Sequence, residues 1–207
     1  MADFTSKELY MMNGGQLMYM YKDGLGDSYH ATPSEEAMWA KEVVEKTLGI
    51  IATETNSVNL QFAIANLVYH KYDGIPALLL ETMEHSTPER RIVFATALWN
   101  MVEYKNSFDV IIEILKQHRP ALLNNVFQGL NDFKEHEGAK YFLVNCLEGD
   151  DDDLHIKAQN TLAIWAFTGM PQLRENNLLE MLQIENKNNA TFKTATEKLI
   201  EILKVRK

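Results

Sequence analysis

The sequence predicts an all-α protein built from about four to five stacked helix pairs. Two observations predict this class: a motif recurs every 32 residues between positions 56 and 165, and its apolar residues follow helical spacing. The alternation typical of β-strands does not occur after residue 30. A repeated unit of this size cannot bury its apolar face alone, so it must stack against its neighbours.

The repeat predicts where the helices begin. Pro88 occupies a position suited to a helix start, and its equivalents are Asn56, Pro120 and Asp152. We expect a helix of about 15 residues from each of these positions, since three to four turns are typical of globular proteins. The shorter partner helices are expected at 75–83, 108–115, 139–147 and 173–182. A final helix is expected at 189–205.

Residues 1–33 differ in composition and are predicted to form an N-terminal capping segment, followed by a repeat domain at 34–207. Thr5 and Glu8 have the spacing of a capping box, and Asn13-Gly14 would end that short helix. Methionines and tyrosines are concentrated here, including Met18, Tyr19, Met20 and Tyr21. They either cover the apolar end of the first repeat or contact a partner, and we favour the cap because solenoids need covered ends.

Charge and composition restrict the classes of partner and compartment. The chain carries a formal net charge of -9. The charge is -6 over residues 122–155 and +3 over 156–207. Nucleic acid is therefore a disfavoured partner, and a basic protein segment is favoured. No apolar run is long enough to span a membrane and no secretory signal is present, so we expect a cytoplasmic protein. The single cysteine, Cys146, is expected to be a buried structural thiol.

The residues at the starts of the repeats resemble the HEAT and armadillo superfamily. The run from Asp150 to Ala158 is similar to the acidic turn and second-helix start of a HEAT unit, and Ala97 to Val102 is similar to the end of an armadillo third helix. Asn124-Asn125 and Leu60-Gln61 depart from the apolar-basic pair of that pattern, which interrupts any regular Asp/Arg ladder. The resemblance covers about residues 34–182. It implies a right-handed superhelix whose second helices line the concave side, and it implies binding more often than catalysis.

Two faces of the longer helices have different compositions. One face is predicted to form the core. It carries Val58, Phe62, Ala65 and Tyr69; Arg90, Phe94, Ala97 and Met101; Leu122, Val126, Gly129 and Phe133; and Leu154, Ala158, Thr161 and Trp165. The opposite face is rich in side-chain amides in the middle repeats. We predict that it binds a partner protein through Gln61, Thr96, Trp99, Asn100, Asn125, Gln128, Asp132, Lys157 and Asn160.

The amides and one tryptophan carry this binding hypothesis. A side-chain amide offers donors and an acceptor, so a row of amides can bind an extended peptide backbone of any sequence. Asn100 is the residue most similar to the asparagine row of armadillo proteins, and Trp99 would be an aromatic anchor. The alternative is a solvated helix face without a partner.

The sequence gives little support for a metal site or an enzyme. Asp150 to Asp153 lack the spacing and glycine of a calcium loop, and Asp151 with His155 offers only two ligands. We expect no cofactor or metal. The alternative function is a HEAT-like enzyme acting on nucleic acid, as DNA glycosylases do, or on a modified protein side chain. The single His136-Glu137 pair and the few basic residues in the predicted groove argue against both.

Overall fold

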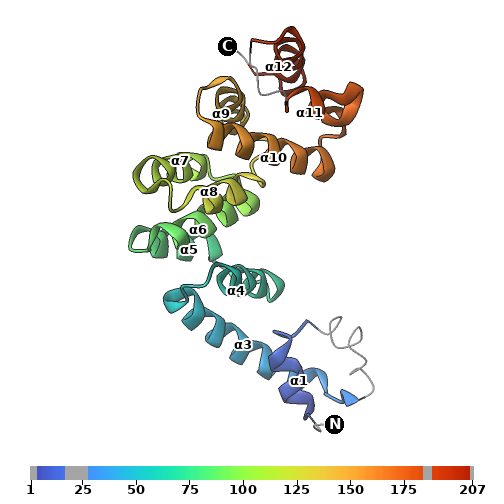
Figure 1. The fold of residues 1–207 in the computed structure, drawn as a ribbon. Helices are drawn as coiled ribbons and strands as arrows, with labels where there is room; N and C mark the ends of the chain where they lie inside the picture. The colour runs from blue at the N-terminus through green and yellow to red at the C-terminus, as the bar shows by residue number, and fades with distance from the viewer. Residues whose placement is uncertain (1–3, 17–27, 184–187, 206–207) are drawn as a thin grey trace. The chain divides into compact units, whose positions relative to one another are not determined.

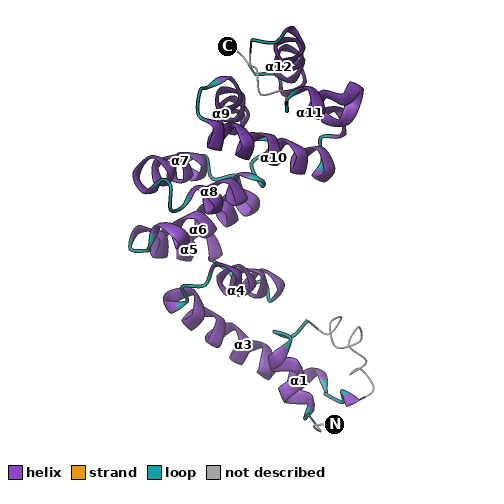
Figure 2. Cartoon of the chain, viewed as in Figure 1, coloured by secondary structure: helices purple, strands orange, loops and turns teal. Residues whose placement is uncertain are grey.

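The structure, a computed structural model, describes residues 4–16, 28–183 and 188–205, and these ranges contain helices and loops without a strand (Figures 1 and 2). The predicted all-α class is therefore confirmed. The chain divides into two compact units, residues 1–93 and 94–207. The boundary falls within helix α6 (Pro88–Val102), and each unit is described by itself.

Local sequence signals start the helices of the first unit. Thr5 and Thr32 each form a capping box, with Glu8 and Glu35 respectively. The Asn56 side chain accepts hydrogen bonds from the Val58 and Asn59 amides. These caps satisfy amide groups that a helix start leaves without an intrahelical partner. The helices of this unit are α1 (Ser6–Met12), α3 (Pro33–Thr53), α4 (Ser57–Tyr69) and α5 (Ile75–Glu84), followed by the beginning of α6.

The described part of the N-terminal segment covers α3 and α4. Tyr10 of α1 is buried, and its ring centroid lies 5.6 Å from that of Trp39 of α3. The His70 ring lies 2.7 Å from the Gly14 carbonyl, and the Gln16 amide donates to Asn66 at 3.0 Å. These contacts cover part of α3 and α4, and the capping role of the whole segment stays a prediction. Met18, Tyr19, Met20 and Tyr21 lie outside the described residues.

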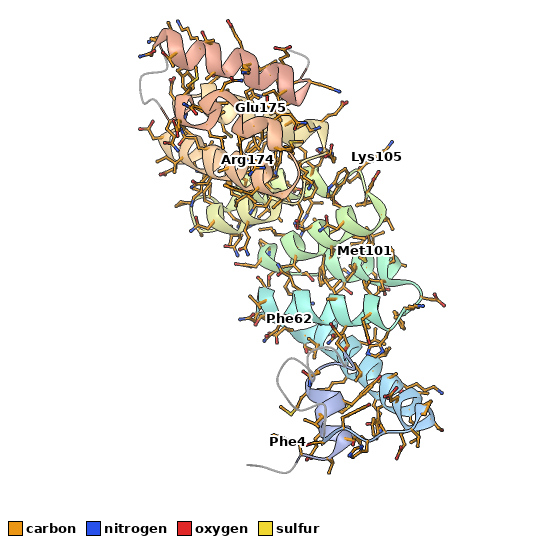
Figure 3. The ribbon with its side chains drawn as sticks, turned by 90° about the vertical axis from the view of Figure 1, so that its right-hand side faces the viewer. Phe4, Phe62, Met101, Lys105, Arg174 and Glu175 are labelled. Carbon is orange, nitrogen blue, oxygen red and sulfur yellow. The ribbon has the colours of Figure 1, made fainter. Side chains whose placement is uncertain are left out.

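The predicted core face of α4 is wrong. Figure 3 shows Phe62 on the surface, and it is 65% exposed. The other members of the predicted stripe, Val58, Ala65 and Tyr69, are also exposed. The buried residues are Leu60, Ala63, Ile64 and Leu67, which lie on the opposite side of the helix. Both faces of α4 are apolar, so periodicity could not decide which one packs against α3.

A buried arginine binds the C-terminal end of α3. Arg90 is 9% exposed, and its guanidinium donates to the Ile51 carbonyl at 2.6 Å and to the Ala52 carbonyl at 3.1 Å. The last carbonyls of a helix lack intrahelical donors and carry its negative dipole end. Arg90, the first residue of the predicted α6 core stripe, is therefore buried because its charged side chain caps the C-terminal end of α3.

The second unit begins with the remainder of α6 and continues to the final helix. Its helices are α7 (Ser107–His118), α8 (Leu123–Leu130), α9 (Glu137–Glu148), α10 (Asp152–Thr168), η2 (Pro171–Asn177), α11 (Leu178–Met181) and α12 (Ala190–Leu203). Pro120 was expected to begin a helix, but α8 begins at Leu123 with Leu122 as its N-cap. The prediction of one helix over 173–182 is also wrong. Asn176 and Asn177 adopt left-handed conformations there and separate the 3-10 helix η2 from the short α11.

The predicted core stripes of the second unit largely agree with the structure. Val126, Phe133, Ala158 and Trp165 are fully buried, and Leu154 is half-buried. In α6, Phe94 is fully buried, whereas Ala97 and Met101 are half-buried. Cys146 is buried, as predicted, and burial raises the pKa of its thiol to about 12.

Candidate functional site

Two tryptophans hold the C-terminal end of α8 between α6 and α10. The Trp99 indole of α6 donates to the Asp132 carbonyl at 3.1 Å. The Trp165 indole of α10 donates to the neighbouring Asn131 carbonyl at 3.0 Å. The two donors bind carbonyls that follow the last turn of α8, where the intrahelical ladder ends. The contacts fix α8 beside α10 within the second unit.

The C-terminal end of α10 is bound in the same way. Lys134 lies in the loop after α8, and its ammonium donates to the Thr168 carbonyl at 2.6 Å. A cation at this position is favourable because the C-terminal end of a helix carries partial negative charge. Two hydrogen bonds thus join the C-terminal ends of α8 and α10. In one, Trp165 of α10 donates to the end of α8, and in the other, Lys134 after α8 donates to the end of α10.

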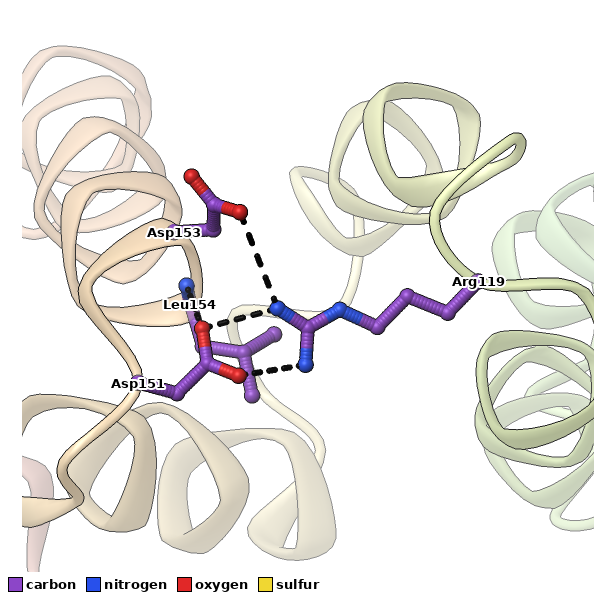
Figure 4. Close-up of polar contacts among 4 residues, drawn as sticks. All are labelled: Arg119, Asp151, Asp153 and Leu154. Carbon is purple, nitrogen blue, oxygen red and sulfur yellow. Dashed lines mark hydrogen bonds and ion pairs between the residues drawn. The ribbon is translucent and has the colours of Figure 1, made fainter.

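An ion pair joins the end of α7 to the start of α10 (Figure 4). The Arg119 guanidinium binds both oxygens of Asp151, with one distance of 2.7 Å, and lies 3.9 Å from Asp153. Asp151 also accepts from the Leu154 amide as the N-cap of α10. The Arg119 hydrogen bonds, and secondarily the Leu154 amide, lower the pKa of Asp151 to about 2. One carboxylate therefore caps α10 and binds the end of α7.

We expect the stability of the second unit to depend on pH through Asp151. Its folded pKa lies below the ordinary value of 3.8, so the ionised carboxylate stabilises the fold above about pH 4. That contribution is lost as pH falls towards 2. The difference in free energy of unfolding between the wild type and Asp151→Asn should therefore shrink over this range in urea titrations. Asp152→Asn is the control, and an equal pH dependence of the two variants would contradict the assignment.

The structure brings most of the predicted partner-binding residues into the second unit. On α8, Gln128 is exposed and Asn125 is half-buried, and Asp132 follows as an exposed residue. On α10, Asn160 is exposed and Lys157 is half-buried. Thr96, Trp99 and Asn100 lie on the part of α6 that belongs to this unit. Gln61 is exposed on α4 of the first unit.

Trp99 has a defined structural role. Its ring stacks on Phe133 at a centroid distance of 5.3 Å and meets the edge of His136 at 5.0 Å. His136 caps α9 by accepting from the Ala139 amide, and burial lowers its pKa. These contacts orient Trp99 towards the helix junction. Among the α6 residues predicted to bind a partner, Asn100 is the exposed one, and the Thr96 hydroxyl is buried.

The exposed apolar residues of α10 were not predicted as binding residues. Ile156, Ile164 and Phe167 are 52%, 39% and 75% exposed, and they share one helix face with Asn160. We call these four residues the α10 stripe. The Arg174 guanidinium lies 5.2 Å from the Phe167 ring centroid, over its face. Their spacing of four, four and three residues is visible in the sequence, but Trp165 and Leu162 on the other side form a competing apolar face.

The acidic run and the histidine of α10 have structural partners. Asp151 binds Arg119, while the His155 ring is buried and lies 2.9 Å from the Leu147 carbonyl. The Gln159 amide lies 2.8 Å from the other ring nitrogen. Within the described residues, no group of three or more His, Cys, Asp or Glu side chains is arranged to hold a metal ion.

Comparisons with known proteins give no relatives: no family model, curated protein or solved structure matches the chain significantly. None of the described helices is both long and apolar enough to cross a membrane.

Proposed function

We propose that the chain is a non-catalytic protein-interaction module that binds an extended partner segment across α8 and α10. We further propose that its repeats form a right-handed HEAT/armadillo-type superhelix and that it acts in the cytoplasm. The observation that supports binding best is the exposed α10 stripe, which lies on the helix packed beside the amide-bearing α8. Exposed apolar side chains grouped on one face are typical of interaction surfaces.

The two helices offer complementary chemistry for an extended segment. Gln128 and Asn160 are exposed amides that can donate to and accept from a peptide backbone. Ile156 and Phe167 are large apolar groups that can bury side chains of the bound segment. The segment would lie across α8 and α10 and contact both kinds of group.

Charge favours a basic partner. Residues 122–155, which include all of α8 and the start of α10, carry a net charge of -6. Potentials of opposite sign speed association and disfavour partners of like charge. We therefore expect the bound segment to place lysine or arginine near the start of α10. We expect it to place apolar residues near Phe167.

A peptide selection tests this proposal. Phage-displayed twelve-residue peptides are selected on the intact chain, and their affinities are then measured by titration calorimetry. We expect the combined variant Gln128→Ala, Asn160→Ala and Phe167→Ala to weaken binding by at least about tenfold, because a few central contacts dominate interface energies. All three side chains are exposed, so the fold should be retained.

The matched control replaces the same residue types on other surfaces. Gln183→Ala, Asn145→Ala and Phe4→Ala also remove exposed side chains and should leave peptide affinity unchanged. Equal losses in the two triple variants, or selected peptides that bind neither α8 nor α10, would show that this surface is not the binding site.

A further inference from the structure

Helices α9 and α12 pack side by side in the second unit (Figure 1). A cavity of about 500 Å³ lies at the start of α9 and the end of α12, and one of about 400 Å³ lies at their other ends. Volumes on the order of 300–1,000 Å³ are typical of ligand-binding pockets. We call the surface that includes both cavities the α9–α12 groove.

Each cavity of the groove contains an accessible apolar side chain. Tyr141 of α9 is 47% exposed and lines the first cavity, and Ile200 of α12 is half-buried and lines the second. Phe192 and Leu203 of α12 lie at opposite ends and are almost fully buried. The apolar face of a ligand could therefore contact Tyr141 at one end of the groove and Ile200 towards the other.

Carboxylates lie at both ends of α9. Glu137 lines the first cavity and Glu148 lines the second, and both are exposed. They are eleven positions apart and share a helix face with Tyr141, because eleven residues make about three turns. At about 1.5 Å per residue they are separated by roughly 16 Å along the helix axis. The cations of the groove are Lys140, which lies 3.6 Å from Glu135, together with Lys193 and Lys204.

We propose that the α9–α12 groove binds an amphipathic helix of a partner protein with basic residues at both ends of its apolar stripe. A helix fits because two neighbouring helices form a groove that accepts the side-chain ridge of a third. An extended segment fits less well, since one side-chain amide, Asn188, is present among the described residues that line the cavities. Basic side chains eleven positions apart on the ligand would meet Glu137 and Glu148.

This site is separate from the α10 stripe and has a different ligand chemistry. The proposed partner on α8 and α10 is extended and binds amides, whereas the ligand of the α9–α12 groove is helical and binds between carboxylates. Two such surfaces on one unit would allow the chain to hold two proteins together. The inference does not depend on the function proposed for α8 and α10.

The test uses the full chain and a designed fifteen-residue alanine-based peptide with blocked ends. The peptide carries two lysines eleven positions apart and two leucines on the same face between them. Its control carries glutamates in place of the lysines. We expect the lysine peptide to bind about tenfold more tightly, since two exposed charge pairs contribute this much, and the preference should weaken at high salt.

Variants of the chain then locate the site. Tyr141→Ala should weaken binding of the lysine peptide about tenfold, and the exchange Glu137→Lys with Glu148→Lys should reverse the preference in favour of the glutamate peptide. Amide chemical shifts should change in α9 and α12, with helical content verified by circular dichroism. The variant Gln128→Ala, Asn160→Ala and Phe167→Ala should bind the lysine peptide normally, which separates this test from the one above.

Several outcomes would overturn the proposal. These are equal affinity for the two peptides, shift changes confined to α8 and α10, or an unchanged preference after the charge exchange. Self-association of the chain that the Tyr141→Ala variant abolishes would also overturn it, because the groove would then bind a second copy. If the charge-exchange variant does not fold, the result for Tyr141→Ala decides.

Discussion

Replacing Trp165 with alanine should destabilise the second unit by about 3–5 kcal/mol, the range for truncating a fully buried large aromatic side chain. Trp165 has no exposed surface, and its indole donates to the Asn131 carbonyl. The substitution leaves a cavity and removes the donor that fixes the end of α8 to α10. Urea unfolding should show the loss, and the melting temperature should fall by on the order of 10 °C for a chain of this size.

Two further variants separate the causes of this loss. Trp165→Phe keeps most of the apolar volume but removes the donor, so it should cost about 1–3 kcal/mol. Phe167→Ala, only two residues further along, removes a ring that is 75% exposed and should cost less than about 1 kcal/mol. Similar losses for Trp165→Ala and Phe167→Ala would contradict the burial of α10 as described.

Helix starts could be predicted because their signals are local. The start at Thr5 with Glu8 was identifiable from a few neighbouring residues, and α1 begins there. The capping box of Thr32 with Glu35 at the start of α3 is an equally local signal. The start near Pro120 was wrong, although Pro88 at the equivalent position begins α6. The period therefore located the starts of α4, α6 and α10, whereas α8 has 8 residues instead of the expected length of about 15.

The buried side of a helix was harder to predict. For α10, the stripe with Ala158 and Trp165 was correctly assigned to the core. For α4, the equivalent stripe with Phe62 lies in solvent, because Leu60 and Leu67 form a second apolar face that packs instead. When both faces are apolar, the packing partner decides between them, and that partner is not encoded within the helix.

The side-chain hydrogen bonds that cap helix ends were not predicted, although the 32-residue period of the sequence contains a signal for them. Lys134 binds the Thr168 carbonyl 34 residues away, and Arg119 binds Asp151 at a separation of 32. The sequence separation between donor and acceptor is about one 32-residue period in both cases. Cationic residues one period before a helix terminus are therefore candidates to cap it. The Arg119–Asp151 pair joins the end of α7 to the start of α10 across one such period.

The exposure of the residues in the proposed site could be predicted in part. The exposed amides Gln128 and Asn160 were identified from their position on the helices. Trp99 was expected to be an aromatic anchor for a partner, but its binding role remains a prediction because its ring and indole already have internal partners. Ile156 and Phe167 were missed because exposure of apolar residues depends on which helices pack nearby.

Replacing Arg90 with methionine should destabilise the first unit by about 1.5–3 kcal/mol, the range for hydrogen bonds that involve a charged group. Methionine keeps an apolar stem of similar length, so the loss reports the polar interactions of the guanidinium, which include the bonds to the Ile51 and Ala52 carbonyls. Hydrogen exchange in the last turn of α3 should accelerate, because this turn loses its cap and the favourable interaction with the helix dipole.

Comparison of three substitutions distinguishes capping by Arg90 from a general effect of charge. Arg90→Lys keeps the cation but cannot bind two carbonyls with a planar fork, so its loss should be intermediate. Lys41→Met removes an exposed cation from α3 itself and should change stability by less than about 0.5 kcal/mol. If Lys41→Met were as harmful as Arg90→Met, net charge would be the cause and the cap would contribute little. Acceleration confined to the end of α3 in the Arg90 variants would instead assign the stabilisation to the two carbonyls, since a change in net charge acts on the whole unit.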